Sequence, residues 1–127
     1  MAKQIRYGMV GGDLHAFIGE IHRKAINFDT RIEFAAGCFS RDAAKNEETA
    51  QEYCIDKSRV YGDFREMAAK EDARDDGIDF VVITTPNSTH YEVAKEFLSH
   101  GINVVCEKPL CFEISEAEEL VSLAKEK

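Results

Sequence analysis

The stretch "IDFVVITT", residues 78–85, decides the fold of this chain because it is apolar almost throughout. A short run of this kind is typical of a parallel strand that is covered on both faces. Similar runs predict strands at residues 4–10, 31–39 and 102–106. Helical patterns separate them, and strands joined through helices form parallel sheets with right-handed connections. The sequence therefore predicts an α/β fold, a doubly wound, Rossmann-type parallel sheet with helices on both faces.

The segments between the predicted strands carry the periodicity of helices. Apolar residues recur at steps of three and four after the first strand: Ile18, Ile21, Ala25 and Phe28. That spacing places one apolar stripe on a helix. A polar helix is predicted over residues 40–54, and a shorter one starts at Asp63.

Helix-end signals mark the last two predicted helices. Thr89 with Glu92, and Ser115 with Glu118, have the spacing of capping boxes at helix starts. Gly101 lies where the C-terminus of a helix favours a left-handed residue. We therefore expect helices to begin after Thr89 and after Ser115.

Composition and charge exclude several classes of protein. A length of 127 residues suits one domain, 1–127, and a net charge of −8 would repel a nucleic-acid backbone. No apolar run approaches the roughly 18 residues of a membrane helix, and "MAKQIRYGMV" lacks a signal-peptide core. The four cysteines form no C-x-x-C motif and have no histidine at zinc-site spacing. We expect a cytoplasmic protein with reduced thiols, and no membrane, nucleic-acid or metal partner.

Ligands of doubly wound sheets bind at the carboxyl ends of the strands, so the first candidate site is "GGDLHAFIG". Gly11 and Gly12 allow backbone amides, and the start of the following helix, to approach a phosphate. The strict G-x-G-x-x-G spacing is absent, and Asp13 would repel a pyrophosphate unless it turned away to cap the helix. A tight turn without a ligand is the alternative interpretation.

The second candidate site is "CFSRD", at the end of the second strand. NAD-selective sites usually place an acid here, which accepts hydrogen bonds from the ribose. This chain instead has Ser40 and Arg41, and a guanidinium could hold the 2′-phosphate of NADP. The cofactor is therefore NAD or NADP, with a slight preference for NADP. The alternative is that Ser40 only caps a helix and Arg41 is a solvated side chain.

The third candidate site is "TTPNSTH", which follows the strand at residues 78–85. Thr85 supplies a hydroxyl, and Pro86 ends the ladder and directs Asn87 across the mouth of the sheet. We expect Asn87 to face a ribose or a carboxamide. His90 lies at a helix start, where a neutral imidazole is favoured, and we expect it in the cofactor site.

The fourth candidate site, "EKP" at residues 107–109, completes a resemblance to a known family. Together with "TTPNSTH", the modified glycine loop and "SRD", it resembles the N-terminal NAD(P)-binding Rossmann domain of the Gfo/Idh/MocA oxidoreductases. The segment "AFIGEIHR" is similar to a subgroup in which Phe17 and Ile18 line the cofactor side of an elongated loop. Leu14 of the same loop is also expected at the cofactor.

The resemblance implies roles for the residues that follow the last strand. Glu107 would shape the cofactor pocket, and Lys108 would be the catalytic residue, acting on the reacting oxygen where nicotinamide meets substrate. Pro109 would hold the backbone beside this lysine. The implied activity is hydride transfer between NAD(P) and a sugar, polyol or related hydroxyl or keto substrate.

The family's second, sheet-rich substrate domain does not occur in residues 1–127, so the resemblance implies that this fragment alone is inactive. The strand at residues 102–106 would then be left as an unpaired apolar edge, which predicts a homo-oligomer. A non-catalytic dinucleotide-sensing or regulatory module on the same fold is the main alternative. A methyltransferase-like domain ranks last, because it does not predict "EKP" after a strand.

Overall fold

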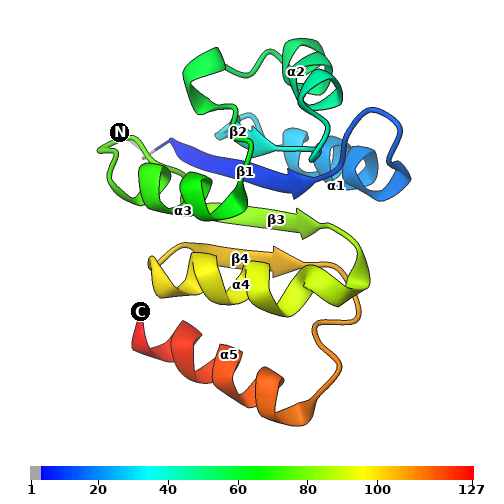
Figure 1. Cartoon of the computed structure of the whole chain (residues 1–127). Coiled ribbons are helices and arrows are strands. Elements are labelled where there is room, and N and C mark those ends of the chain that lie inside the picture. The colour runs from blue at the N-terminus through cyan, green and yellow to red at the C-terminus, as the bar shows by residue number, and fades with distance from the viewer. Residues whose placement is uncertain (1–3) are drawn as a thin grey trace.

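A computed structural model describes residues 4–127 and contains one parallel, four-stranded sheet of order β2-β1-β3-β4 (Figure 1). The strands are β1 (Ile5–Gly11), β2 (Ile32–Cys38), β3 (Phe80–Thr84) and β4 (Asn103–Cys106). All three strand pairs are parallel, so the four carboxyl ends lie at one edge of the sheet. Residues 1–3 of the segment "MAKQIRYGMV", which was predicted to lack a signal-peptide core, lie outside the described range.

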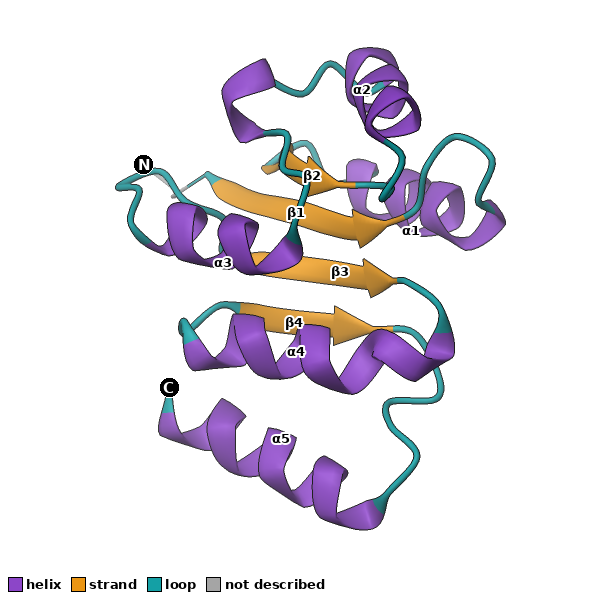
Figure 2. Cartoon of the chain, in the orientation of Figure 1, coloured by secondary structure: helices purple, strands orange, loops and turns teal. Residues whose placement is uncertain are grey.

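Helices cover both faces of this sheet (Figure 2). The α-helices are α1 (Phe17–Asn27), α2 (Ala43–Glu52), α3 (Phe64–Asp72), α4 (His90–Ser99) and α5 (Ile114–Glu126). Two short 3-10 turns, η1 (Lys57–Arg59) and η2 (Asn87–Thr89), precede α3 and α4. The predicted doubly wound α/β fold is confirmed. Within the described residues, none of the helices has both the length and the apolar character needed to span a membrane.

The core consists of two apolar clusters, one on each face of the sheet. On one face, Val81 and Ile83 of β3 belong to a cluster that includes Met67 of α3 and Val93 of α4. On the other face the cluster contains Tyr7 and Met9 of β1, Val82 of β3, Phe39 and Ala50. Alternate residues of β3 thus enter opposite clusters, as the two-residue period of a strand requires. This explains why the sequence of β3 is apolar without interruption.

Neither predicted capping box is formed, although α4 begins directly after Thr89, as expected. The hydroxyl of Thr89 donates to the Pro86 carbonyl at 2.7 Å instead of capping α4. At α5, the capping box is formed by Glu113 and Glu116, so the helix begins at Ile114. Gly101 has a φ of +75°, which confirms the predicted left-handed residue after α4.

Strand β4 lies at the edge of the sheet. Among the described residues it pairs only with β3, and the side chain of Val105 is 43% exposed. Helix α5 packs against α4 rather than completing the sheet (Figure 1). The predicted unpaired edge is therefore present, whereas association through it stays a prediction.

Candidate functional site

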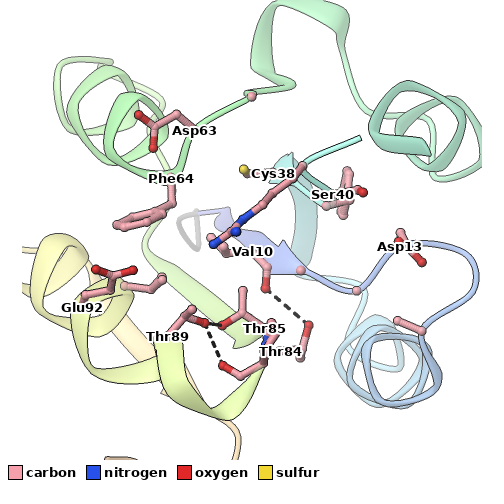
Figure 3. Close-up of a pocket in the computed structure, with 18 of the residues that line it drawn as sticks. Val10, Asp13, Cys38, Ser40, Asp63, Phe64, Thr84, Thr85, Thr89 and Glu92 are labelled. Carbon is pink, nitrogen blue, oxygen red and sulfur yellow. Dashed lines mark hydrogen bonds between the residues drawn. The ribbon is translucent and has the colours of Figure 1, made fainter. Parts of the chain in front are cut away.

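A cavity of about 710 Å³ opens at the carboxyl ends of β1, β2 and β3 (Figure 3). Several residues that the sequence analysis selected contribute to its lining: Gly11, Gly12, Asp13, Ser40, Arg41, Thr85 and Pro86. They come from three separate turns, each of which follows a different strand. Parallel pairing brings these turns together, so the prediction that the strand ends meet at one site is confirmed for these three strands.

The glycine loop after β1 makes a turn that side chains would obstruct. Gly11 and Gly12 have φ angles of +82° and +76°, a region that other residues rarely adopt. A Cβ atom on Gly12 would lie 2.5 Å from the sulfur of Met9 and 3.1 Å from the hydroxyl oxygen of Thr84. Both glycines line the cavity, so backbone rather than side chain forms this part of its wall.

Asp13 does not cap the first helix, contrary to the sequence-based expectation. Its carboxylate accepts a hydrogen bond from the His15 amide at 2.9 Å, within the loop. Helix α1 starts only at Phe17, and its N-cap residue, Ala16, makes no side-chain cap. The intervening loop separates the helix start from the glycines, and the carboxylate satisfies the nearest free amide. The Leu14 amide donates to the Thr49 hydroxyl of α2 at 3.2 Å, which anchors the loop.

Three residues predicted for this loop region and its helix lie outside the cavity lining: Leu14, Phe17 and Ile18. Phe17 is 77% exposed at the start of α1. These three side chains do not line the cavity, and their contact with a cofactor stays a prediction.

The two residues predicted for the turn after β2, Ser40 and Arg41, have different surroundings. The Ser40 hydroxyl accepts a hydrogen bond from the Asp42 amide at 3.1 Å, while the Asp42 carboxylate caps α2 through the Ala44 and Lys45 amides. The alternative in which Ser40 caps the helix is therefore wrong. Arg41 is exposed and lines the cavity.

Two acids that the sequence analysis did not select also line the cavity, Asp63 and Glu92. The Asp63 carboxylate accepts from the Arg65 amide at 3.0 Å and so caps α3. Glu92 forms an ion pair with Arg65, with 3.6 Å between the charged atoms. Asp63 was predicted from the sequence only as a helix start, and nothing local indicated that it lines the cavity.

The segment that leads to Asp63 is held by a buried polar network. Glu71 of α3 is 1% exposed and forms an ion pair with Arg59. Its carboxylate also accepts from the Tyr61 hydroxyl at 2.6 Å and from the Ile78 amide at 3.2 Å. Burial, together with the hydrogen bond to this carboxylate, raises the pKa of Tyr61. The network fixes the chain just before the wall formed by Asp63.

The turn after β3 contributes Thr85, Pro86 and Thr89 to the cavity, and the Thr89 hydroxyl bonds to both of the others (Figure 3). Asn87 instead lines a smaller neighbouring hollow of about 220 Å³. His90 is fully buried, and both of its ring nitrogens lie within hydrogen-bond distance of backbone carbonyls. His90 does not line the cavity, and its expected contact with a cofactor stays a prediction.

The "EKP" residues lie at the carboxyl end of β4, beside the cavity but not in its lining. The Lys108 side chain is exposed, and its ammonium has no ion pair with residues 4–127. The Lys108–Pro109 peptide bond is cis. Glu107 pairs with His22 of α1, with 3.0 Å between Oε2 and Nε2. This hydrogen bond holds the pKa of Glu107 below its usual value, so the carboxylate is ionised near neutral pH.

A comparison with models of protein families identifies the family of this chain. Residues 5–127 match the Gfo/Idh/MocA model, described as an oxidoreductase family with an NAD-binding Rossmann fold. The chain belongs to the Gfo/Idh/MocA oxidoreductase family. The resemblance inferred from the sequence motifs is thereby confirmed, and this chain contains the NAD-binding Rossmann domain of the family.

Gfo/Idh/MocA relatives match almost the whole chain. An uncharacterized oxidoreductase of Bacillus subtilis (strain 168), YfiI, is 39% identical over 128 residues, covering 100% of this chain and 33% of the relative. A crystal structure of an inositol dehydrogenase homolog from Azotobacter vinelandii, complexed with NAD+, has 40% identity and a TM-score of 0.91. It covers 98% of this chain and 32% of the other. The chain thus spans about a third of the length of these relatives.

A third Gfo/Idh/MocA relative has a stated substrate. The scyllo-inositol 2-dehydrogenase (NADP(+)) IolU of Bacillus subtilis (strain 168) is 38% identical over 87 residues. The match covers 68% of this chain and 24% of that enzyme.

We predict that Gly19→Ala displaces the glycine loop, because Gly19 of α1 packs against Gly12. A Cβ atom on Gly19 would lie 2.7 Å from the Cα atom of Gly12, so α1 and the loop must move apart. Overpacking of this kind costs about 1 to 3 kcal/mol of unfolding free energy, partly offset by about 1 kcal/mol of helix propensity. Urea denaturation measures the loss. Gly62→Ala is the control, because its Cβ atom meets nothing within 4 Å, and an equal loss in both variants would contradict the prediction.

Proposed function

We propose that residues 1–127 are the dinucleotide-binding domain of an NAD(P)-dependent oxidoreductase that acts on a sugar, polyol or related hydroxyl or keto substrate. The observation that carries the proposal is the cavity of about 710 Å³, lined by the glycine loop and by Ser40 and Arg41. Its volume lies in the usual range of small-molecule sites. The exposed Lys108 lies two residues beyond the end of the neighbouring strand, β4.

The residues present fit a dinucleotide. The side-chain-free turn at Gly11 and Gly12 leaves room for a pyrophosphate, and the turn after β2 offers Ser40 and Arg41 to a ribose. A bound nicotinamide supplies or accepts the hydride. Lys108 donates a hydrogen bond to the reacting oxygen of the substrate and holds or releases a proton there. Glu107, directly before Lys108, is held by its hydrogen bond with His22 of α1.

Relatives support the polyol part of the proposal. The relative IolU is a scyllo-inositol 2-dehydrogenase, and a second structure of the Azotobacter vinelandii homolog is complexed with NADH and myo-inositol. That homolog is 40% identical to this chain. The remaining two-thirds of such relatives would supply the substrate pocket, and we propose that the complete protein is a cytoplasmic homo-oligomer.

The binding test uses titration calorimetry of this chain with NADH and NADPH. We expect binding of a dinucleotide without turnover, because three strand-end turns form the cavity whereas the chain carries a third of its relatives' length. The affinity for either dinucleotide should be weak, since residues 1–127 alone supply the contacts in this titration. No heat with either dinucleotide at millimolar concentration would contradict the cofactor assignment.

We propose a preference for NADP on the basis of Arg41. Two carboxylates of the cavity lining and the neighbouring Asp42 are already engaged: Asp63 caps α3, Glu92 pairs with Arg65, and Asp42 caps α2. Arg41 is exposed beside them and lines the cavity. A guanidinium there suits a 2′-phosphate, to which it can donate two parallel hydrogen bonds.

Arg41→Ala should therefore weaken NADPH binding by about 1.5 to 3 kcal/mol, roughly 10- to 150-fold in Kd, the contribution of a charged hydrogen bond. NADH affinity should change little, since it lacks the phosphate. Calorimetry with both cofactors measures the difference, and Arg31→Ala, at the opposite end of β2, is the matched control. An equal loss for NADH and NADPH would assign Arg41 to the general surface.

A further inference from the structure

Lys108 is exposed, but the residue on each side of it contacts a different helix. On one side, the Glu107 amide donates to the Ile83 carbonyl of β3 at 3.1 Å, which continues the sheet by one residue. The Glu107 carboxylate reaches His22 of α1 at 3.0 Å. Both of these side chains are 24% exposed, so the pair is largely shielded from water. This contact ties the residue before Lys108 to α1.

On the other side, His90 connects two turns. The ring belongs to the first residue of α4 and is 0% exposed. Its Nδ1 lies 2.7 Å from the Pro109 carbonyl oxygen, and its Nε2 lies 2.9 Å from the Thr85 carbonyl oxygen. Thr85 lines the cavity, and Pro109 directly follows Lys108. A single buried ring therefore joins the cavity wall to the turn that carries the lysine.

Both partners of the His90 ring are hydrogen-bond acceptors. A carbonyl oxygen only accepts hydrogen bonds, so each contact needs an N–H on the ring. A neutral imidazole has one N–H and would leave the second carbonyl facing a lone pair. A neutral ring therefore donates to one of the two carbonyls and packs against the other, and with either tautomer it lies between the two turns.

We propose that His22 and His90 are positioning residues that fix the backbone on the two sides of Lys108 and thereby set the place of its ammonium group. Neither histidine lines the cavity, so both act through Glu107 and Pro109 rather than by touching a cofactor. The catalytic meaning of this arrangement rests on the proposed function of Lys108. The arrangement itself is a property of this chain and is measurable without a substrate.

The first measurement is nuclear magnetic resonance of the unmodified chain, labelled with ¹⁵N. Long-range correlation spectra of histidine rings report which nitrogens carry protons. We expect a ring N–H of His90 that exchanges slowly with solvent, because the ring is buried and lies against two backbone carbonyls. A His90 ring N–H that exchanges as fast as that of the exposed His15 would overturn the bridge. This measurement needs no variant, so it applies even if substitution of His90 prevents folding.

The second measurement follows hydrogen exchange of the Glu107 amide in variants. His90→Phe keeps a ring of similar volume without donors, and His22→Leu removes the partner of the carboxylate. Each should accelerate exchange at Glu107 about tenfold, as loss of one hydrogen bond implies, and leave the Met9 amide in central β1 unchanged. His22→Gln, which retains a donor, should restore part of the protection. His15→Ala, an exposed histidine in the loop, is the matched control.

The outcomes separate this inference from the proposed function. A wild-type exchange rate at Glu107 in either His22→Leu or His90→Phe would overturn the positioning role. Equal acceleration at Met9 would show a loss of global stability instead, and would overturn it too. Titration with NADH is independent of these results. Failure to bind would contradict the cofactor assignment while the exchange data still decide whether the two histidines fix the turn.

Discussion

Lys108→Ala should lower the turnover number of the complete oxidoreductase by roughly two to four orders of magnitude, the usual contribution of a positioned acid or base. Cofactor affinity should change little, because Lys108 is exposed and lies outside the cavity lining. Steady-state kinetics gives kcat, and titration with the cofactor gives Kd. Lys108→Arg should not restore the rate fully, since arginine does not release its proton and its fork does not suit a single contact.

Lys125→Ala is the matched control for this experiment, because Lys125 is an exposed lysine near the end of α5. Its turnover number should equal that of the unmodified protein. If Lys108→Ala instead kept its turnover number and lost stability or cofactor affinity, Lys108 would be structural. A dinucleotide-sensing module would then explain the chain better than an enzyme.

Arg59→Leu should lower the free energy of unfolding by about 3 to 5 kcal/mol, a large part of the roughly 5 to 15 kcal/mol of a typical domain. The substitution leaves the Glu71 carboxylate, 1% exposed, without its cationic partner. The Tyr61 hydroxyl and the Ile78 amide still donate to it, but neither carries a charge. Urea denaturation of the isolated chain measures the loss.

Arg74→Leu is the control for Arg59, because Arg74 pairs with the exposed Asp76 at 2.8 Å on the same part of the surface. A solvated pair of this kind contributes about 0 to 1 kcal/mol. The double variant Arg59→Leu with Glu71→Leu should regain part of the stability, since it removes the isolated charge. Equal losses for Arg59→Leu and Arg74→Leu would show that burial of Glu71 does not determine the effect.

The sequence by itself determined the alternation of strands and helices, and therefore the parallel sheet. Strands and helices are recognised by apolar residues that recur every two to four positions, and this spacing is a local property of the chain. The same holds for the places where ligands approach, because a turn after a parallel strand always lies at the carboxyl edge. Gly11, Ser40 and Thr85 were identified on that basis, and all three line the cavity.

Only the tertiary structure decided how side chains are paired. Asp13 accepts from an amide of its own loop instead of capping α1, because the loop at 12–16 delays that helix. The Thr89 hydroxyl donates to the Pro86 carbonyl, although α4 begins at the next residue. His22 meets Glu107, and His90 meets Pro109, although many residues separate each pair in sequence. Contacts of this kind depend on strand order and helix packing, which no local period encodes, so the ties around Lys108 appear only once the chain is folded.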